Sequence, residues 1–172
     1  MKVELIDKMG TDLSVVNAAR VSYAKVKEEF EESDERLIRY LAEHNHWSPF
    51  AHTFLSFRIK APVFVARQLV KHQVGLVWNE ESRRYITHDP EIYNIRKWRE
   101  KPDSSKQGSG EQIIISTELN LEVNEHLQQG LSLYNRLLLE NVAPEQARAI
   151  LPQSMYTNCL LYTSDAADDN VG

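Results

Sequence analysis

The chain has 172 residues and a formal net charge of −5, with 42% hydrophobic and 26% charged residues. This balance is that of an ordinary globular protein, and the length suits one domain with its own core. No apolar run approaches the ~20 residues that span a bilayer, and the N-terminus lacks the apolar segment of a secretory signal. The single cysteine, Cys159, excludes an internal disulfide and a CxxC metal site. We therefore expect a cytoplasmic protein that binds neither membranes nor nucleic acids.

The N-terminal half of the sequence predicts short strands and helices in alternation, because its apolar residues change from a period of two to helical spacing and back. The predicted elements are a strand over residues 2–7, a helix from Thr11 or Asp12 to Arg20, a helix capped by Ser33, a strand over 51–60 and a helix over 62–73.

The C-terminal half predicts mostly helix. Its predicted elements are a loop at 78–84, a strand at 85–87, a flexible surface loop at 101–110, a long amphipathic helix over 111–140 and a short helix between Pro144 and Pro152. The fold class that follows is α+β, with a mixed or antiparallel sheet flanked by helices, of which one is long and amphipathic.

Positive charge gathers in the middle of the sequence. Residues 58–84 contain six lysines and arginines but two glutamates, although the chain as a whole is acidic. The helix predicted over 62–73 would place Gln68, Lys71 and His72 near its C-terminal end on one face. Such a stripe suits an anionic ligand, for example a nucleotide phosphate. A solvated basic face explains the charge alone equally well.

The segment that follows adds polar groups of several kinds. Asn79, Glu80, Ser82 and Arg84 offer an amide, a carboxylate, a hydroxyl and a guanidinium within a few residues of one another. This set suits a ligand that carries both a phosphate and a hydrogen-bonding base. Residues 67–84 are therefore the candidate binding segment.

These residues carry a resemblance to a known family. Asn79-Glu80-x-Ser82-x-Arg84-Tyr85, preceded by a basic residue and a histidine, resembles the signature of the flavin-dependent thymidylate synthases, R-H-R followed by a spacer and N-E-x-S-x-R-Y. The resemblance runs from about residue 3 to Asn158. The other strings that carry it are Ala18-Ala19-Arg20-Val21-Ser22-Tyr23, His46-x-Ser48-Pro49-Phe50-x-His52, Ala61-Pro62-x-Phe64-x-Ala66-Arg67-Gln68 and Ala147-Arg148-x-x-Leu151-Pro152-x-x-x-Tyr156-Thr157.

The resemblance implies a role for each matching residue. Those expected to bind deoxyuridylate (dUMP) are Gln68, Lys71, Glu80, Ser82, Arg83, Arg84 and Arg148, with Arg84 and Arg148 toward its phosphate. Those expected to bind flavin adenine dinucleotide (FAD) are Ser48, Lys71, His72, Gln73 and Glu80. Lys71 and Gln73 stand where the signature has arginines, and the spacer before Asn79 is one residue longer. These departures indicate weaker flavin binding or a divergent, phage-type branch.

The resemblance also implies a reaction. The family converts dUMP to dTMP with methylenetetrahydrofolate as the carbon donor and NADPH-reduced FAD as the hydride donor, and its members are homotetramers with shared active sites. No enzyme cysteine attacks the pyrimidine. An arginine that activates the uracil lies beyond the position of Asn158 in the family, so we assign no catalytic residue here. A chain with Cys159 as its one cysteine fits this mechanism.

Other functions remain open at this point. A non-catalytic module that binds nucleotide and flavin on the same fold is favoured by the Lys71 and Gln73 departures. A helical interaction protein built on residues 111–140 leaves the 67–84 segment unexplained. His44, His46 and His52 lack acidic or thiol partners at ligand spacing, so we expect no metal.

The end of the sequence departs from the family. Residues 159–169 resemble a translated sequencing adapter, and the family's flavin-binding asparagine and arginines are absent there. We expect residues 1–158 to be a flavin-dependent thymidylate synthase-like domain, incomplete at its C-terminus, and residues 159–172 to be a non-native tail. The truncated chain is then expected to have impaired activity. Sequencing the source gene past codon 158 tests this boundary.

Overall fold

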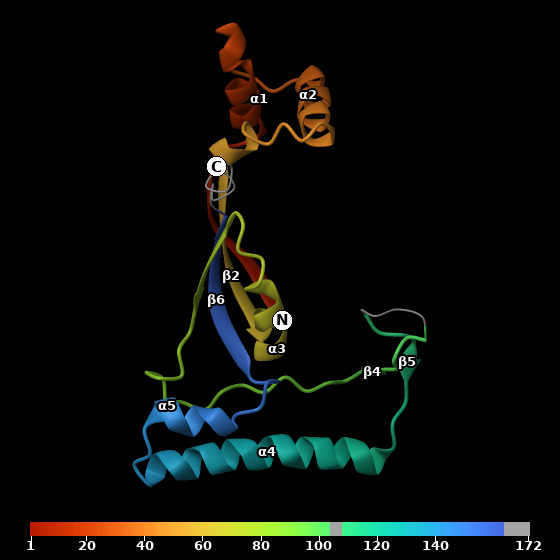
Figure 1. Cartoon of the computed structure of the whole chain (residues 1–172), viewed down its shortest axis with the longest axis vertical. Coiled ribbons are helices and arrows are strands. Elements are labelled where there is room, and N and C mark those ends of the chain that lie inside the picture. The colour runs from red at the N-terminus through yellow and green to blue at the C-terminus, as the bar shows by residue number, and fades with distance from the viewer. Residues whose placement is uncertain (104–107, 164–172) are drawn as a thin grey trace. The chain divides into compact units, whose positions relative to one another are not determined.

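The computed structural model describes residues 1–103 and 108–163 (Figure 1). The chain divides into two compact units. Unit 1 consists of Met1–Lys60, Gln68–Glu80 and the segment from Asn158, and unit 2 consists of Ala61–Arg67 and Glu81–Thr157. Helices and an antiparallel sheet are both present, which confirms the predicted α+β class.

Unit 1 is built on a four-stranded sheet in the order β1-β2-β6-β3. Its strands are β1 (Lys2–Met9), β2 (Phe54–Pro62), β3 (Leu76–Glu80) and β6 (Tyr156–Thr163). β1 pairs antiparallel with β2, with a bulge or irregularity between Leu5 and Asp7. β3 pairs antiparallel with β6 from Leu76↔Thr163 to Glu80↔Cys159. The last described strand therefore separates β3 from the two N-terminal strands.

Two helices of unit 1 lie between the first two strands in sequence. α1 (Asp12–Arg20) begins at the cap Thr11, as predicted, because the Thr11 N–H donates to Ser14 Oγ in a capping box. The short helix η1 (Val21–Tyr23) follows it directly. α2 (Glu32–Glu43) begins at the cap Glu31, and not at the predicted Ser33. A second short helix, η2 (Phe50–His52), leads into β2.

Unit 2 is mainly helical. Its elements are the hairpin β4 (Trp98–Arg99) and β5 (Gln112–Ile113), the long helix α4 (Thr117–Leu139), α5 (Pro144–Ala147) and the short helix η3 (Arg148–Ile150). Tyr134 of α4 is fully buried, and its hydroxyl donates to the Ile86 carbonyl at 3.4 Å. This contact joins the long helix to the segment that follows β3.

Three predicted boundaries are wrong. The helix expected over 62–73 is α3 (Val63–Leu69), which ends early, and Gly75, with φ of +70°, lies in the turn that leads into β3. Residues 76–80 form that strand, whereas the strand expected at 85–87 is absent. The long helix begins at Thr117 and not at 111. Ser116 is its N-cap, because the Ser116 hydroxyl accepts from the Leu119 N–H. The loop expected at 101–110 falls partly outside the described residues.

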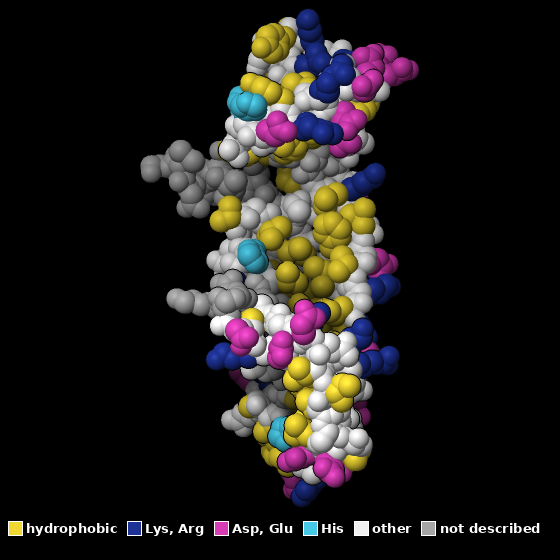
Figure 2. Space-filling view, turned by 90° about the vertical axis from the view of Figure 1, so that its right-hand side faces the viewer, with side chains coloured by type: hydrophobic (Ala, Val, Ile, Leu, Met, Phe, Trp, Pro, Cys, Tyr) yellow, Lys and Arg dark blue, Asp and Glu magenta, His cyan; other side chains and the backbone are white. Residues whose placement is uncertain are grey.

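Many large hydrophobic side chains remain exposed. Figure 2 shows such side chains gathered on one face of the part of the molecule that the sheet occupies. Exposed members of the sheet are Val3, Leu5, Ile6, Met9, Leu55, Val77, Leu160 and Tyr162. Apolar groups clustered in this way usually mark a surface that another protein chain or a ligand covers.

Gly10 joins β1 to α1 in a conformation that suits glycine. Its φ is +83°, and a Cβ atom there would lie 2.8 Å from Thr53 Cγ2. We expect Gly10→Ala to lower the free energy of unfolding by more than about 1 kcal/mol. Gly130→Ala in α4 is the matched control, because a Cβ there meets nothing nearer than 3.6 Å. It should raise stability by about 1 kcal/mol. Urea unfolding of both variants checks this, and a stable Gly10→Ala would contradict it.

Candidate functional site

The first signature residues lie in unit 1. Gln68 is on α3, and Lys71, His72 and Gln73 occupy the turn between α3 and β3 rather than a helix face. The His72 N–H donates to the Leu69 carbonyl at 3.0 Å, which closes this turn. All four side chains are exposed. The turn therefore presents a cation, an imidazole and an amide to solvent, and Gln68 adds a second amide from α3.

Glu80 is the last residue of β3. Its backbone is in register with Cys159 of β6, and the indole N–H of Trp78 lies 3.4 Å from its carboxylate. The preceding Asn79 is in register with Leu160. Strand pairing thus fixes the backbone of these two signature residues, which the sequence placed in a loop.

The following signature residues belong to unit 2. Arg84 Nε donates to Ser82 Oγ at 3.1 Å, and the Arg84 guanidinium lies 5.1 Å from the centre of the Tyr85 ring. The hydroxyl and the ring hold an exposed cation in place. Since its two contacts come from the signature's own Ser82 and Tyr85, the local sequence already orients Arg84.

Arg83 and Arg148 are placed differently. Arg83 is 7% exposed, donates to the His88 carbonyl and lies 3.7 Å from the Glu81 carboxylate. Its charge is therefore engaged within unit 2. Arg148 begins η3 and is exposed, and its Nε donates to the Glu145 carbonyl at 3.1 Å. The guanidinium of Arg148 retains donors that can face an anion.

A cavity of about 410 Å³ lies within unit 1. Its lining residues are Ala18, Ala19, Ser22, Leu41, Asn45, His46, Trp47, Ser48 and Pro49. One wall comes from the end of α1 with η1, and the other from the end of α2 with the turn after it. The structure thereby brings together two of the strings that carry the family resemblance, around Ser22 and around Ser48.

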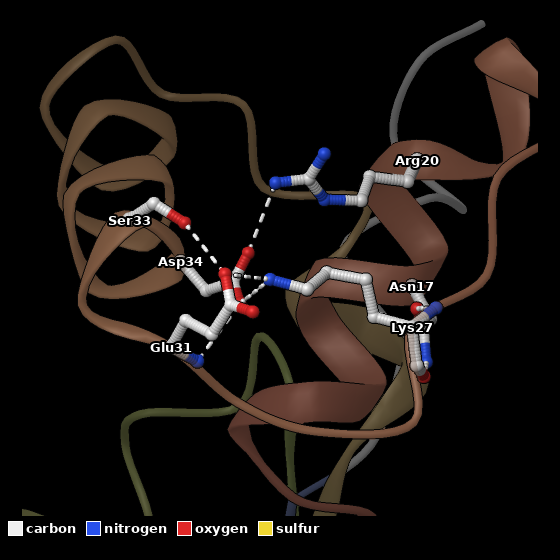
Figure 3. Close-up of polar contacts among 6 residues, drawn as sticks. All are labelled: Asn17, Arg20, Lys27, Glu31, Ser33 and Asp34. Atoms are coloured by element: carbon white, nitrogen blue, oxygen red, sulfur yellow. Dashed lines mark hydrogen bonds and ion pairs between the residues drawn. The ribbon is translucent and has the colours of Figure 1, made fainter.

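A buried carboxylate ties the helices beside this cavity together (Figure 3). The Asp34 side chain is 0% exposed. Arg20 Nη2 donates to its Oδ1 at 2.9 Å, and Lys27 Nζ donates to its Oδ2 at 2.5 Å. The Glu31 N–H donates to Oδ2 at 3.0 Å. The bond from Lys27, then those from Glu31 and Arg20, lower the pKa of Asp34 to about 2, although burial opposes the shift.

Asn17 fixes the loop that carries Lys27. Its side-chain amide donates to the Lys27 carbonyl at 2.9 Å, and its Oδ1 accepts from the Lys27 N–H at 2.9 Å. Lys27 Nζ also donates to the Glu31 carboxylate at 2.9 Å. The bonds to Asp34 and Glu31 raise the pKa of Lys27. We call Asn17, Arg20, Lys27, Glu31 and Asp34 the Asp34 network.

The part of the chain that the structure describes contains neither a metal-binding cluster nor a membrane-spanning helix. No group of three or more His, Cys, Asp or Glu residues is arranged to hold a metal ion there. Among the helices described, none is long and apolar enough to cross a membrane.

Comparison with known proteins identifies the family. Residues 4–164 match the family described as thymidylate synthase complementing protein. The chain belongs to this family. The flavin-dependent thymidylate synthase of Kosmotoga olearia is 42% identical over 161 residues, which are 91% of this chain and 68% of that protein. Its counterpart in Thermus thermophilus is 39% identical over 155 residues, which are 90% of this chain and 56% of that protein.

Solved structures of similar proteins agree with this family membership. The UMP/dUMP methylase PolB from Streptomyces cacaoi, bound with 5-Br dUMP, is 32% identical, with a TM-score of 0.73 over 94% of this chain and 72% of that one. The complex with 5-Br UMP gives a TM-score of 0.72. The family recognised from the signature is thus confirmed, and the chain spans between about half and three quarters of these relatives.

The sequence left two features without a role. Residues 25–32 are mostly lysine and glutamate and form no recognisable motif, although Lys27 and Glu31 belong to the Asp34 network. The cavity is lined by two of the strings that carry the family resemblance, around Ser22 and around Ser48. Ser48 was the one residue of these strings with an expected role, so the strings themselves were a signal for a site. What joins them is the packing of α1 on α2, which no spacing in the sequence specifies.

The Asp34 network should make part of the stability depend on pH. The pKa of Asp34 falls from 3.8 to about 2 on folding, so its contribution is complete above about pH 4 and is lost as the pH falls toward 2. The difference in unfolding free energy between wild type and Asp34→Asn should therefore be largest above pH 4 and shrink toward pH 2. Urea unfolding at several pH values measures it, and a difference independent of pH would contradict the assignment.

Proposed function

We propose that this chain acts in thymidylate synthesis, converting dUMP to dTMP with methylenetetrahydrofolate as the carbon donor and NADPH-reduced FAD as the hydride donor. Family membership supports the reaction, as does the name of PolB, a UMP/dUMP methylase. The observation that carries the proposal is Arg84, an exposed guanidinium that Ser82 and Tyr85 of the signature hold in place. Its action in the cytoplasm stays a prediction.

The residues proposed to bind dUMP are the seven that the family resemblance implies. Gln68, Lys71 and Glu80 come from unit 1, while Ser82, Arg83, Arg84 and Arg148 come from unit 2. Arg84 and Arg148 have exposed guanidinium groups suited to a phosphate. Arg83 is already engaged by Glu81 and His88, so its contribution would be to hold the segment on which Arg84 lies.

The residues proposed to hold FAD fit a phosphate-bearing cofactor. Ser48 offers a hydroxyl in the 410 Å³ cavity, and Lys71, His72, Gln73 and Glu80 offer a cation, ring nitrogens, an amide and a carboxylate. When bound and reduced, FAD supplies the hydride. Lys71 keeps the positive charge of the signature arginine but not its two-pronged hydrogen bonding, so phosphate contact should be less directional.

The chemistry proposed does not need a cysteine nucleophile. Cys159 is 2% exposed within β6, where a thiol is inaccessible to a substrate. Cations beside the nucleotide would instead favour negative charge that develops on the pyrimidine, which is electrostatic stabilisation by groups already in position. The residue that activates the uracil stays unassigned in this chain.

A non-catalytic module that binds nucleotide and flavin is the second candidate. Lys71 and Gln73, which replace signature arginines, favour it. Both candidates predict binding, but turnover is expected of the first alone. That residues 159–172 are a non-native tail stays a prediction.

Self-assembly into a homotetramer is proposed from the exposed sheet. Val3, Leu5 and Met9 of β1 are exposed at the edge of the sheet, beside Leu55 of β2. Exposed apolar side chains along an edge strand form a surface that proteins usually cover. A second copy of the chain is the proposed partner, and the family resemblance implies that the subunits share active sites.

Assembly can be tested on β1. We expect Leu5→Asp to shift the protein to a smaller species in sedimentation velocity, because a charge in a covered apolar surface is costly. Val26→Asp is the matched control, since Val26 is exposed in the loop before α2. Unchanged sedimentation of Leu5→Asp, with native circular dichroism, would remove β1 from the interface.

The visible absorption spectrum of the purified chain with FAD tests the function. We expect a bound-flavin spectrum that shifts when dUMP is added, because Lys71 and Glu80 are proposed to contact both ligands. A folded chain that binds neither ligand would overturn the proposal. Binding without turnover, when methylenetetrahydrofolate and NADPH are present, would favour the non-catalytic module.

The same titration tests Arg84. Arg84→Ala should weaken dUMP binding by about 1.5–3 kcal/mol, the loss of one charge-assisted hydrogen bond. Arg36→Ala is the control, since Arg36 is exposed on α2 and pairs with Glu32 of its own helix. Equal dUMP affinity in wild type and Arg84→Ala would refute the role of Arg84 at the phosphate.

A further inference from the structure

We propose that Asp34 is a positioning residue for the cavity of unit 1, because its carboxylate holds the α1 wall of that cavity against α2. The inference rests on the proposed function in one respect, that Ser48 in this cavity contacts FAD. Asp34 itself does not line the cavity. It would therefore act on the ligand through Arg20 and the residues beside Arg20.

Arg20 lies in the α1 wall of the cavity. Ala18, Ala19 and Ser22 line the cavity, and Arg20 lies between them at the point where α1 passes into η1. A hydrogen bond that holds the Arg20 side chain therefore also restrains the backbone of this wall. The opposite wall, from Leu41 to Pro49, belongs to α2 and the turn after it.

The Arg20 guanidinium is held by Asp34. Arg20 Nη2 donates to Asp34 Oδ1 at 2.9 Å. Arg20 Nε is buried and has no hydrogen-bond partner among the described residues. If the Asp34 carboxylate is removed, the guanidinium loses the anion that holds it, and a partly buried cation without a partner is unfavourable.

Asp34 joins α1 to α2 by two routes (Figure 3). The direct route is its bond to Arg20 at the end of α1. The second runs through Lys27, whose Nζ donates to Asp34 at 2.5 Å and whose backbone is bonded twice to Asn17 of α1. Asp34 thus fixes both the end of α1 and the loop that connects it to α2.

Other ion pairs of α2 lack this geometry. Arg36 pairs with Glu32, and Arg39 pairs with Glu35, at i,i+4 spacing on the exposed surface of the helix. Such pairs contribute little and connect α2 only to itself. Glu35 is therefore a suitable control for Asp34, because it is the adjacent acidic residue on the same helix.

Hydrogen exchange measured by mass spectrometry tests the positioning without any ligand. In Asp34→Asn, amides of the two cavity walls, in peptides over 18–24 and 44–51, should exchange about tenfold faster, as expected for the loss of a charged hydrogen bond. Amides of β1 and β2 should exchange at the wild-type rate, and Glu35→Gln should leave all these peptides unchanged. Equal acceleration everywhere, or none in the cavity walls, would overturn the inference.

A milder variant keeps the inference testable if Asp34→Asn does not fold. Lys27→Gln leaves the bond between Arg20 and Asp34 in place while it removes the second route, and Lys27 is partly exposed. We expect faster exchange in the same two peptides, but by a smaller factor than in Asp34→Asn. Wild-type exchange in a folded Lys27→Gln, together with an Asp34→Asn that does not fold, would count against positioning.

FAD titration then connects the wall to the ligand. Asp34→Asn should weaken FAD binding about tenfold relative to wild type and to Glu35→Gln. Looser cavity walls with unchanged FAD affinity would overturn the inference. A wild-type chain that binds no FAD would overturn the proposed flavin site instead, and the exchange measurement alone would then decide whether Asp34 positions the cavity.

Discussion

The pairing of β6 between β2 and β3 is the constraint on which the signature's position depends. Five backbone pairs join β3 to β6, and every β6 partner in them lies between Cys159 and Thr163. Asn79 and Glu80 are thus held through residues that the sequence assigned to a non-native tail. The proposed boundary after Asn158 falls inside the strand, and the family match extends to residue 164. Strand pairing uses backbone groups, so it places little demand on which side chains follow Asn158.

Division into two units separates the proposed nucleotide-binding residues. Glu80 ends the middle segment of unit 1, and Glu81 begins the main segment of unit 2. Local contacts of different kinds hold the residues of each unit in place. Strand pairing fixes Glu80, whereas a hydroxyl and an aromatic ring hold Arg84. Local preparation of this kind lowers the entropy that a side chain loses when it binds a ligand.

The charges of unit 1 illustrate why burial decides the value of an ion pair. Exposed pairs along α2 are screened by water and gain little. Asp34 is fully buried and accepts from Lys27, Arg20 and the Glu31 N–H, so its lone pairs are satisfied. Loss of the Asp34 carboxylate would leave the partly buried Arg20 guanidinium without its anion, and the cost would fall on the contact between α1 and α2. The stability of the helix pair and the form of the neighbouring cavity therefore have a common origin.

Sequence alone determined the family, the α+β class and most helices, because these depend on short-range patterns. The signature around Asn79 and Arg84 is contiguous, and Thr11 and Pro144 cap or open their helices through neighbouring residues. Tertiary structure decided which segments meet. The turn at Lys71 arises because α3 must end before β3 pairs with β6, and the β4–β5 hairpin replaces the first turns of the expected helix. No motif in the sequence marks Asp34. Its burial against Arg20 and Lys27 required two helices to pack, and spacing along one helix cannot specify its neighbour.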